Sequence, residues 1–220
     1  MTEGVFIVVE GIDGSGSTTV TERLAAHVAS KRRAVHRTCE PSSGPIGSLI
    51  RQILAHRIVV PTEFGTASPS WATMGLLFAA DRLDHLEAEV VPRLRDGVIV
   101  ISDRYDLSSL AYQTATAPTD DPEEARRIVE WIRQLNQRAR RPDLTIVLDV
   151  NPEVAAERRQ GRGGARELYD DAELQARLAK AYATAEQLIV GDFVAHVDAN
   201  ASIDDVVAAA AALVDGLLGR

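Results

Sequence analysis

The chain has 220 residues, 45% of them hydrophobic, and its formal net charge at pH 7 is −8. This length and apolar content predict one sizeable α/β domain, and the acidic balance argues against nucleic-acid and anionic-membrane partners. The single cysteine, Cys39, excludes an internal disulfide framework and suits a reducing compartment. The first predicted strand begins too close to Met1 to leave room for a signal peptide, and no apolar stretch is long enough to cross a bilayer. We therefore expect a cytoplasmic protein.

The first predicted element is the apolar run Val5–Val9, which is typical of a buried parallel strand. A helix is predicted next, because Val20, Leu24 and Val28 recur at helical spacing. The stretch between them, residues 11–18, has the sequence GIDGSGST. It matches the phosphate-binding pattern G-x-x-x-x-G-K-[ST] everywhere except at the lysine, where the chain has Ser17.

This glycine-rich stretch predicts binding of a nucleotide, because its backbone N–H groups and the following helix N-terminus favour a phosphate. The Thr18 hydroxyl would contact Mg²⁺. The alternative is an ordinary Gly/Ser-rich turn, which three glycines at the motif spacing disfavour. The residues expected to bind ATP are Gly11, Ile12, Asp13, Gly14, Ser15, Gly16, Ser17, Thr18 and Thr19.

Strands and helices then alternate to the end of the chain. Further strands are predicted at Ala34–Cys39, Val98–Ile101, Leu144–Leu148 and Phe193–Val197. Helices are predicted at Ile46–Ala55, Trp71–Leu94, Leu107–Ala115, Glu123–Ala139, 152–159 and Ala172–Ile189, and after the capping residue Ser202. This alternation predicts the α/β class, with a central parallel sheet of about five strands and helices on both faces. Ligands should bind beyond the carboxyl ends of the strands.

Asp103 and Arg104 directly follow the strand Val98–Ile101, at the edge where ligands are expected. Asp103 could hold Mg²⁺ or orient an acceptor phosphate. Arg104 could bind a phosphate through two parallel hydrogen bonds. A purely structural ion pair at the end of the strand is the alternative.

Four arginines, Arg158, Arg159, Arg162 and Arg166, surround three glycines near residue 163. This pattern predicts a hinged lid at about 158–170 that brings positive charge to a phosphate chain. The alternative is a solvated helix face, on which these arginines would pair with Glu153, Glu157 or Glu167.

Phe78 and Arg82 are four residues apart within a predicted helix, so they share one face. An aromatic ring beside a guanidinium could stack on a base and hydrogen-bond its edge. By spacing alone, however, Phe78 is more often a core residue.

Together these residues make the chain resemble the thymidylate kinase family from end to end. The matching pieces are residues 10–16 (EGIDGSG), 40–41 (EP), 45–47 (PIG) with 50–51 (IR), 77–82 (LFAADR), 103–105 (DRY) with Ser108, 111–113 (AYQ), 142–144 (PDL) and 149–153 (DVNPE), followed by the arginine segment. A generic phosphate-loop enzyme would not carry the pieces at 77–82 (LFAADR) and 111–113 (AYQ) at these intervals.

The resemblance implies transfer of phosphate from ATP to dTMP with Mg²⁺ and, commonly, a homodimer. Asp13 would contact the sugar or acceptor phosphate region, Phe78 would stack on thymine, and Tyr112 would favour deoxyribose. Arg82 and Gln113 would hydrogen-bond the base. The implied substrate-binding set is Glu40, Arg51, Phe78, Arg82, Arg104, Ser108, Tyr112 and Gln113; the implied catalytic set is Asp13, Asp103, Arg104, Arg158, Arg162 and Arg166. The implied metal ligands are Thr18 and Asp103, and residues 198–202 would lie near adenine.

Two features depart from this pattern. The stretch 57–74 fits the family poorly and is longer than usual. Ser17 removes a cation that stabilises charge during phosphoryl transfer, so two hypotheses follow: a working dTMP kinase compensated by the lid, or a nucleotide-binding protein without useful catalysis. An engineered Ser17 and a kinase for another monophosphate are further alternatives.

Overall fold

The computed structural model describes residues 3–162 and 168–219. At its centre is a parallel sheet with the strand order β2-β5-β1-β6-β7. These strands are β1 (Phe6–Gly11), β2 (Val35–Cys39), β5 (Ile99–Asp103), β6 (Leu144–Asp149) and β7 (Val194–Asp198). The predicted class and the predicted sheet of about five strands are therefore confirmed.

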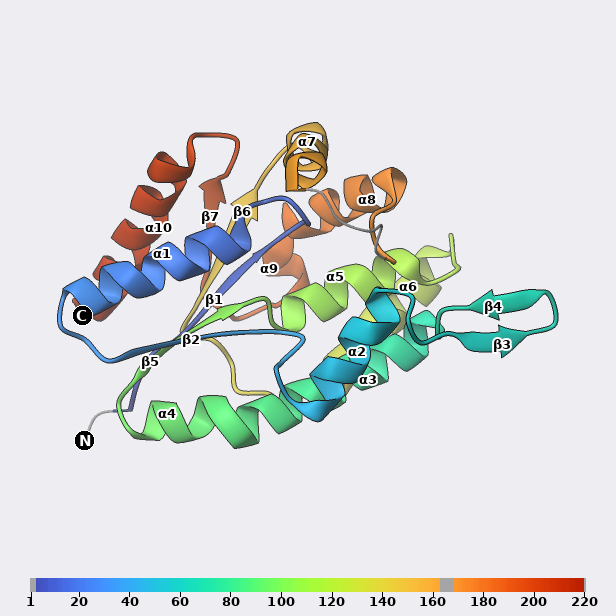
Figure 1. Ribbon diagram of the computed structural model, residues 1–220, viewed down its shortest axis with the longest axis horizontal. Helices are drawn as coiled ribbons and strands as arrows, with labels where there is room; N and C mark the ends of the chain where they lie inside the picture. The colour runs from blue at the N-terminus through green and yellow to red at the C-terminus, as the bar shows by residue number, and fades with distance from the viewer. Residues whose placement is uncertain (1–2, 163–167, 220) are drawn as a thin grey trace.

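Helices cover both faces of this sheet, with α1 and α10 together on one side and α4 on the other (Figure 1). The helices are α1 (Ser17–Ser30), α2 (Pro45–Leu54), α3 (Trp71–His85), α4 (Val91–Arg95), α5 (Asp106–Thr116), α6 (Pro122–Leu135), α7 (Pro152–Arg162), α8 (Ala172–Tyr182), α9 (Ala185–Leu188) and α10 (Ile203–Leu218). Among the described residues, none of these helices combines the length and apolarity that a membrane span requires.

Strand β1 lies in the middle of the sheet and is buried on both faces. Ile7 and Val9 belong to the core cluster that includes Leu24 of α1. Phe6 and Val8 alternate with them and belong to the cluster formed with α4. The two-residue period of a strand explains this division. Because both faces are buried, the carboxyl edge of the sheet is the open place for a ligand.

The long helix predicted over Trp71–Leu94 is interrupted. Helix α3 ends at His85 and is followed by a π-helical turn, η1 (Leu86–Val90), before α4 begins. Pro92 explains the interruption, since proline has no N–H to donate and its ring clashes with the carbonyl four residues earlier. The chain continues from α3 into α4 through this one wider, π-helical turn.

Two other predicted helices are shorter than expected. The single helix predicted over Ala172–Ile189 is divided between α8 and α9, and Thr184 lies at the break, where its hydroxyl bonds the Lys180 carbonyl at 3.2 Å. Helix α6 ends at Leu135 because the Asn136 side chain bonds back to the Ile132 carbonyl at 2.8 Å. Side-chain hydrogen bonds to nearby backbone compete with helix formation at such positions.

The stretch that departs from the family pattern contains a two-stranded antiparallel hairpin, which was not predicted. Its strands are β3 (Val60–Thr62) and β4 (Gly65–Ala67). The hairpin extends away from the body of the molecule beyond α2 and α3 (Figure 1). All six strand residues are exposed, so the alternation of apolar residues that normally identifies a strand is missing.

Candidate active site

The phosphate-loop sequence forms the turn between β1 and α1, as predicted. Gly14 and Gly16 adopt positive φ angles of 93° and 94°, which other residues rarely adopt. A side chain at Gly14 would also meet the Ala155 carbonyl oxygen of α7 at 2.3 Å. The loop is therefore bent by its glycines and packed directly against the start of α7.

A threonine and an aspartate meet beside this loop. Val9 of β1 pairs with Asp103 of β5, so the loop after β1 lies next to the end of β5. Thr18 donates a hydrogen bond to one Asp103 carboxylate oxygen at 2.6 Å. The other oxygen, Oδ1, is buried and has no hydrogen-bond partner among the described residues. This unpaired oxygen and the Thr18 hydroxyl are suitable ligands for Mg²⁺, which takes few protein ligands when phosphates and water supply the rest.

A cavity of about 270 Å³ adjoins the loop. It contains all eight residues expected to bind substrate, together with Asp13. Its walls are Asp13, Glu40, Pro41, Arg51, Leu54, Phe78, Arg82, Arg104, Tyr105, Ser108, Ser109, Tyr112, Gln113 and Tyr169. Three arginines face two carboxylates, so the cavity is locally cationic in a protein whose net charge is −8. An anionic ligand with an aromatic part suits such walls.

The inner end of the cavity has unused hydrogen-bonding capacity. Gln113 is fully buried, and within the described residues neither atom of its amide has a hydrogen bond of good geometry. Arg82 is also buried, and its Nε is unpaired in the described residues. Leaving such groups unsatisfied is costly, which points to a polar ligand that completes them.

The remaining donors of Arg82 hold its side chain in place. Its Nη1 donates to Asn136 Oδ1, and its Nη2 donates to the Tyr105 carbonyl at 3.0 Å and to Ser109 Oγ at 3.1 Å. The Glu40 carboxylate lies 2.7 Å from Nη2. Arg82 is therefore fixed by its neighbours and lines the cavity, with its Nε free of a partner among the described residues.

Arg104 occupies the end of the cavity nearest the loop. Its backbone has a φ of 74°, in the left-handed region that is uncommon for residues other than glycine. Its guanidinium bonds the Gly11 carbonyl at 3.0 Å, forms an ion pair with Asp13 and lies 5.4 Å from the centre of the Tyr112 ring. An ion pair was considered from sequence, but its partner is Asp13 rather than Asp103.

Below Arg104 lies a buried carboxylate, Glu10. It accepts hydrogen bonds from the Tyr105 N–H at 2.8 Å, from the Ser108 hydroxyl at 2.6 Å and from the Tyr182 hydroxyl at 3.2 Å. Burial raises the pKa of Glu10 to about 6, although the hydrogen bonds of Ser108 and the charge of Arg104 oppose that rise. Glu10 fixes the first turn of α5, which carries Ser108 into the cavity.

Two adjacent arginines of α7, Arg158 and Arg159, bond different parts of the structure. Arg158 donates to the Ala199 carbonyl at 2.9 Å, in the stretch expected near adenine, rather than to the phosphate loop. Arg159, which was not in the predicted catalytic set, donates to the Asp13 carbonyl of the loop. The Arg162 side chain and Arg166 fall outside the described residues, as does Glu167.

Three residues of the site were missed. Tyr169 packs against Tyr112 with 5.0 Å between ring centres, Gln175 donates to Asp13 Oδ2 at 3.2 Å, and the Tyr182 hydroxyl joins the Glu10 network. They come from α8 and the chain before it, where the sequence shows only an ordinary amphipathic helix. No motif or spacing distinguished them.

A phosphate loop that follows the first strand of a parallel sheet, beside a cavity for a second anionic molecule, defines the class: a P-loop kinase of small molecules. The family model described as thymidylate kinase matches residues 9–210. The chain therefore belongs to the thymidylate kinase family. The expected chemistry, ATP-dependent phosphoryl transfer to dTMP with Mg²⁺, is confirmed at the level of the family.

Curated relatives agree with this assignment. A probable thymidylate kinase of Pyrobaculum aerophilum is 42% identical over 160 residues, which is 73% of this chain and 72% of the relative. One from Pyrococcus horikoshii is 36% identical over 211 residues, or 96% of each chain. A thymidylate kinase of Bifidobacterium longum is 38% identical over 155 residues, covering 70% of this chain and 71% of that protein.

Proposed function

We propose that this chain transfers the γ-phosphate of ATP to dTMP, giving ADP and dTDP. The observation that carries the proposal is the buried amide of Gln113, which has no hydrogen bond of good geometry within the described residues, in a cationic cavity beside the phosphate loop. An amide offers both a donor and an acceptor, and so does the Watson–Crick edge of thymine. With Arg82 Nε nearby, the cavity can satisfy a pyrimidine and its own buried groups together.

On the donor side, residues 11–19 would bind the ATP phosphates through backbone N–H groups at the start of α1. Thr18 and Asp103 would hold Mg²⁺, which neutralises charge on the phosphate oxygens when it is bound. The unpaired oxygen of Asp103 supports this role.

On the acceptor side, Phe78 would stack on thymine, and Tyr112 would crowd the 2′ position of the sugar. Arg104 and Arg51 would bind the dTMP phosphate, with Asp13 close to the sugar. Arg51 lies at the exposed rim of the cavity, held by the Pro41 carbonyl at 2.8 Å. An arginine at the mouth and one at the loop would hold the acceptor phosphate between them.

The transfer itself needs little covalent chemistry from the protein, because it depends on in-line positioning and stabilisation of charge. We propose that residues 1–220 form one kinase domain and that the arginine segment at about 158–170 serves as its lid. Arg158, Arg162 and Arg166 stay predicted catalytic residues.

The alternative of a nucleotide-binding protein without useful catalysis is not favoured. Loss of one preorganised donor costs about 10²–10³ in rate, which leaves a measurable enzyme when other groups are intact. All eight residues predicted to bind substrate line the acceptor cavity. Relatives that resemble the chain along most of its length carry the kinase name.

A coupled assay of ADP release tests the proposal, with ATP, Mg²⁺ and each of dTMP, dCMP and UMP as acceptor. We expect dTMP to be the preferred acceptor, and its binding at about 100 times its Kd to stabilise the fold by roughly 2.7 kcal/mol. Preference for dCMP or UMP in both turnover and thermal stabilisation would overturn the thymine assignment.

We also propose a cytoplasmic homodimer. The family resemblance supports the dimer, and Leu76 on α3 is an apolar side chain that is 52% exposed. The free, exposed thiol of Cys39 is compatible with a reducing compartment. Sedimentation velocity on the purified chain would show about twice the monomer mass if the dimer exists.

A further inference from the structure

We propose that Arg159 supplies the positive charge that Ser17 fails to supply at the phosphate loop. This inference deepens the proposed function and rests on it for its turnover readout. The structure brings a guanidinium from α7 onto the loop backbone, where Arg159 Nη1 donates to the Asp13 carbonyl. The predicted compensating residues were Arg158, Arg162 and Arg166, so the assignment is to a different side chain.

The position of Arg159 follows from the way α7 packs. The Ala155 carbonyl of α7 is so close to Gly14 that the loop has no room for a Cβ there. Arg159 comes one helical turn after Ala155 and therefore lies on the same face of the helix. Close packing of α7 on the loop thus fixes where the Arg159 guanidinium can reach.

Arg159 also has donors to spare. A guanidinium carries five N–H groups, and the described residues accept one of them, through Asp13. No carboxylate among the described residues forms an ion pair with Arg159. A half-buried guanidinium beside a phosphate loop is suited to bridge two phosphate oxygens, as the missing lysine would.

The neighbouring Arg158 does not fit this role. It is bound to the Ala199 carbonyl, in the stretch after β7. The two adjacent arginines therefore reach different parts of the nucleotide site.

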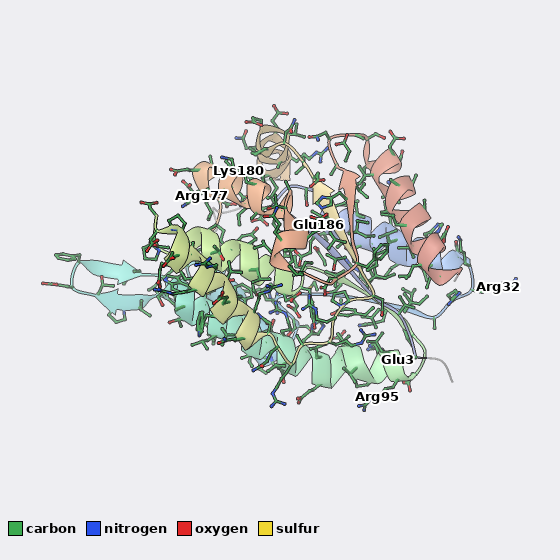
Figure 2. The ribbon with its side chains drawn as sticks, turned by 180° about the vertical axis from the view of Figure 1, so that it is seen from behind. Glu3, Arg32, Arg95, Arg177, Lys180 and Glu186 are labelled. Carbon is green, nitrogen blue, oxygen red and sulfur yellow. The ribbon has the colours of Figure 1, made fainter. Side chains whose placement is uncertain are left out.

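The test is a cycle of four proteins: wild type, Arg159→Gln, Ser17→Lys and the double variant. Arg177→Gln is the matched control, because Arg177 is an exposed arginine of α8 (Figure 2). Turnover with ATP and dTMP and calorimetric binding of β,γ-imido-ATP and AMP are measured for each. Arg159→Lys, which keeps the charge, tests whether charge or side-chain shape matters.

We expect Arg159→Gln to lower kcat by about 10²-fold, in the range for one lost preorganised donor, with the KM for dTMP nearly unchanged. Binding of β,γ-imido-ATP should weaken about tenfold more than binding of AMP, because the β- and γ-phosphates are the ones bridged. Ser17→Lys should recover most of the loss in the double variant and add little to the wild type. Such non-additivity shows that two residues share one role.

The proposal is overturned if Arg159→Gln behaves like Arg177→Gln, or if Ser17→Lys changes both backgrounds by the same factor. If the wild type shows no turnover, the proposed function fails, and the calorimetric cycle still decides the role of Arg159. If the effect of Ser17→Lys on binding of β,γ-imido-ATP then differs between the wild-type and Arg159→Gln backgrounds, Arg159 is supported as a phosphate ligand without catalysis. Equal binding by all four proteins would reject it.

Discussion

Replacing Glu10 by glutamine removes a buried carboxylate while keeping nearly its shape. Glu10 has no solvent exposure and accepts hydrogen bonds from the backbone of Tyr105 and from the Ser108 side chain. A glutamine carbonyl oxygen can accept from Tyr105, and its NH₂ can donate to the Ser108 or Tyr182 oxygen. The substitution therefore tests the charge of Glu10 with little change in packing.

The size of the expected change in the free energy of unfolding follows from the pKa of Glu10. Burial raises the pKa of Glu10 from its ordinary value of 4.5 to about 6. At about 1.4 kcal/mol per pH unit, that rise corresponds to ~2 kcal/mol of stability. A raised carboxyl pKa favours the protonated folded state, so this stability is present below pH 4.5 and lost as the pH rises through 6.

Urea unfolding at a series of pH values from about 4 to 7.5 measures the effect. We expect the free energy of unfolding of the wild type, relative to Glu10→Gln, to fall by ~2 kcal/mol over this range. Other carboxylates titrate in both proteins and cancel in the difference. Glu22→Gln, at an exposed glutamate of α1, shows what loss of a surface carboxylate does. A difference that stays flat, or increases with pH, would refute the reasoning.

Three further substitutions address the site. Gln113→Leu should raise the free energy of unfolding by about 1 kcal/mol, because it removes a buried amide that lacks a good hydrogen bond, and denaturant unfolding measures this. The same substitution should weaken dTMP binding by about 2 kcal/mol, which calorimetry measures. Asn136→Ala should destabilise the fold by about 1–3 kcal/mol, since Arg82 Nη1 loses its buried acceptor, and thermal unfolding checks this. Asp103→Asn should raise the Mg²⁺ concentration for half-maximal turnover by about tenfold or more, and a Mg²⁺ titration of activity measures it.

Much of the fold could be predicted because local sequence determined it. The buried strands are continuous apolar runs, and the loop at residues 11–18 has a pattern that few other structures require. The errors occurred where a single residue overrode the periodicity: Pro92 widens a turn, Thr184 breaks a helix and Asn136 ends one. The hairpin at Val60–Ala67 was missed because neither face is buried.

The site was predicted unevenly for a related reason. Residues inside recognisable motifs, such as Phe78 and Gln113, lie in the cavity as expected. Tyr169 and Gln175 reach the site only through the packing of α8, which no local pattern specifies. Adjacent arginines on α7 differ in what they contact because the helix is docked against Gly14, and that docking is a property of the fold.

The most direct test of the central claim is transfer of ³²P from [γ-³²P]ATP to dTMP by the wild-type chain with Mg²⁺. We expect labelled dTDP that depends on both dTMP and the chain. Labelled inorganic phosphate alone, or no transfer while calorimetry shows that both nucleotides bind, would contradict it.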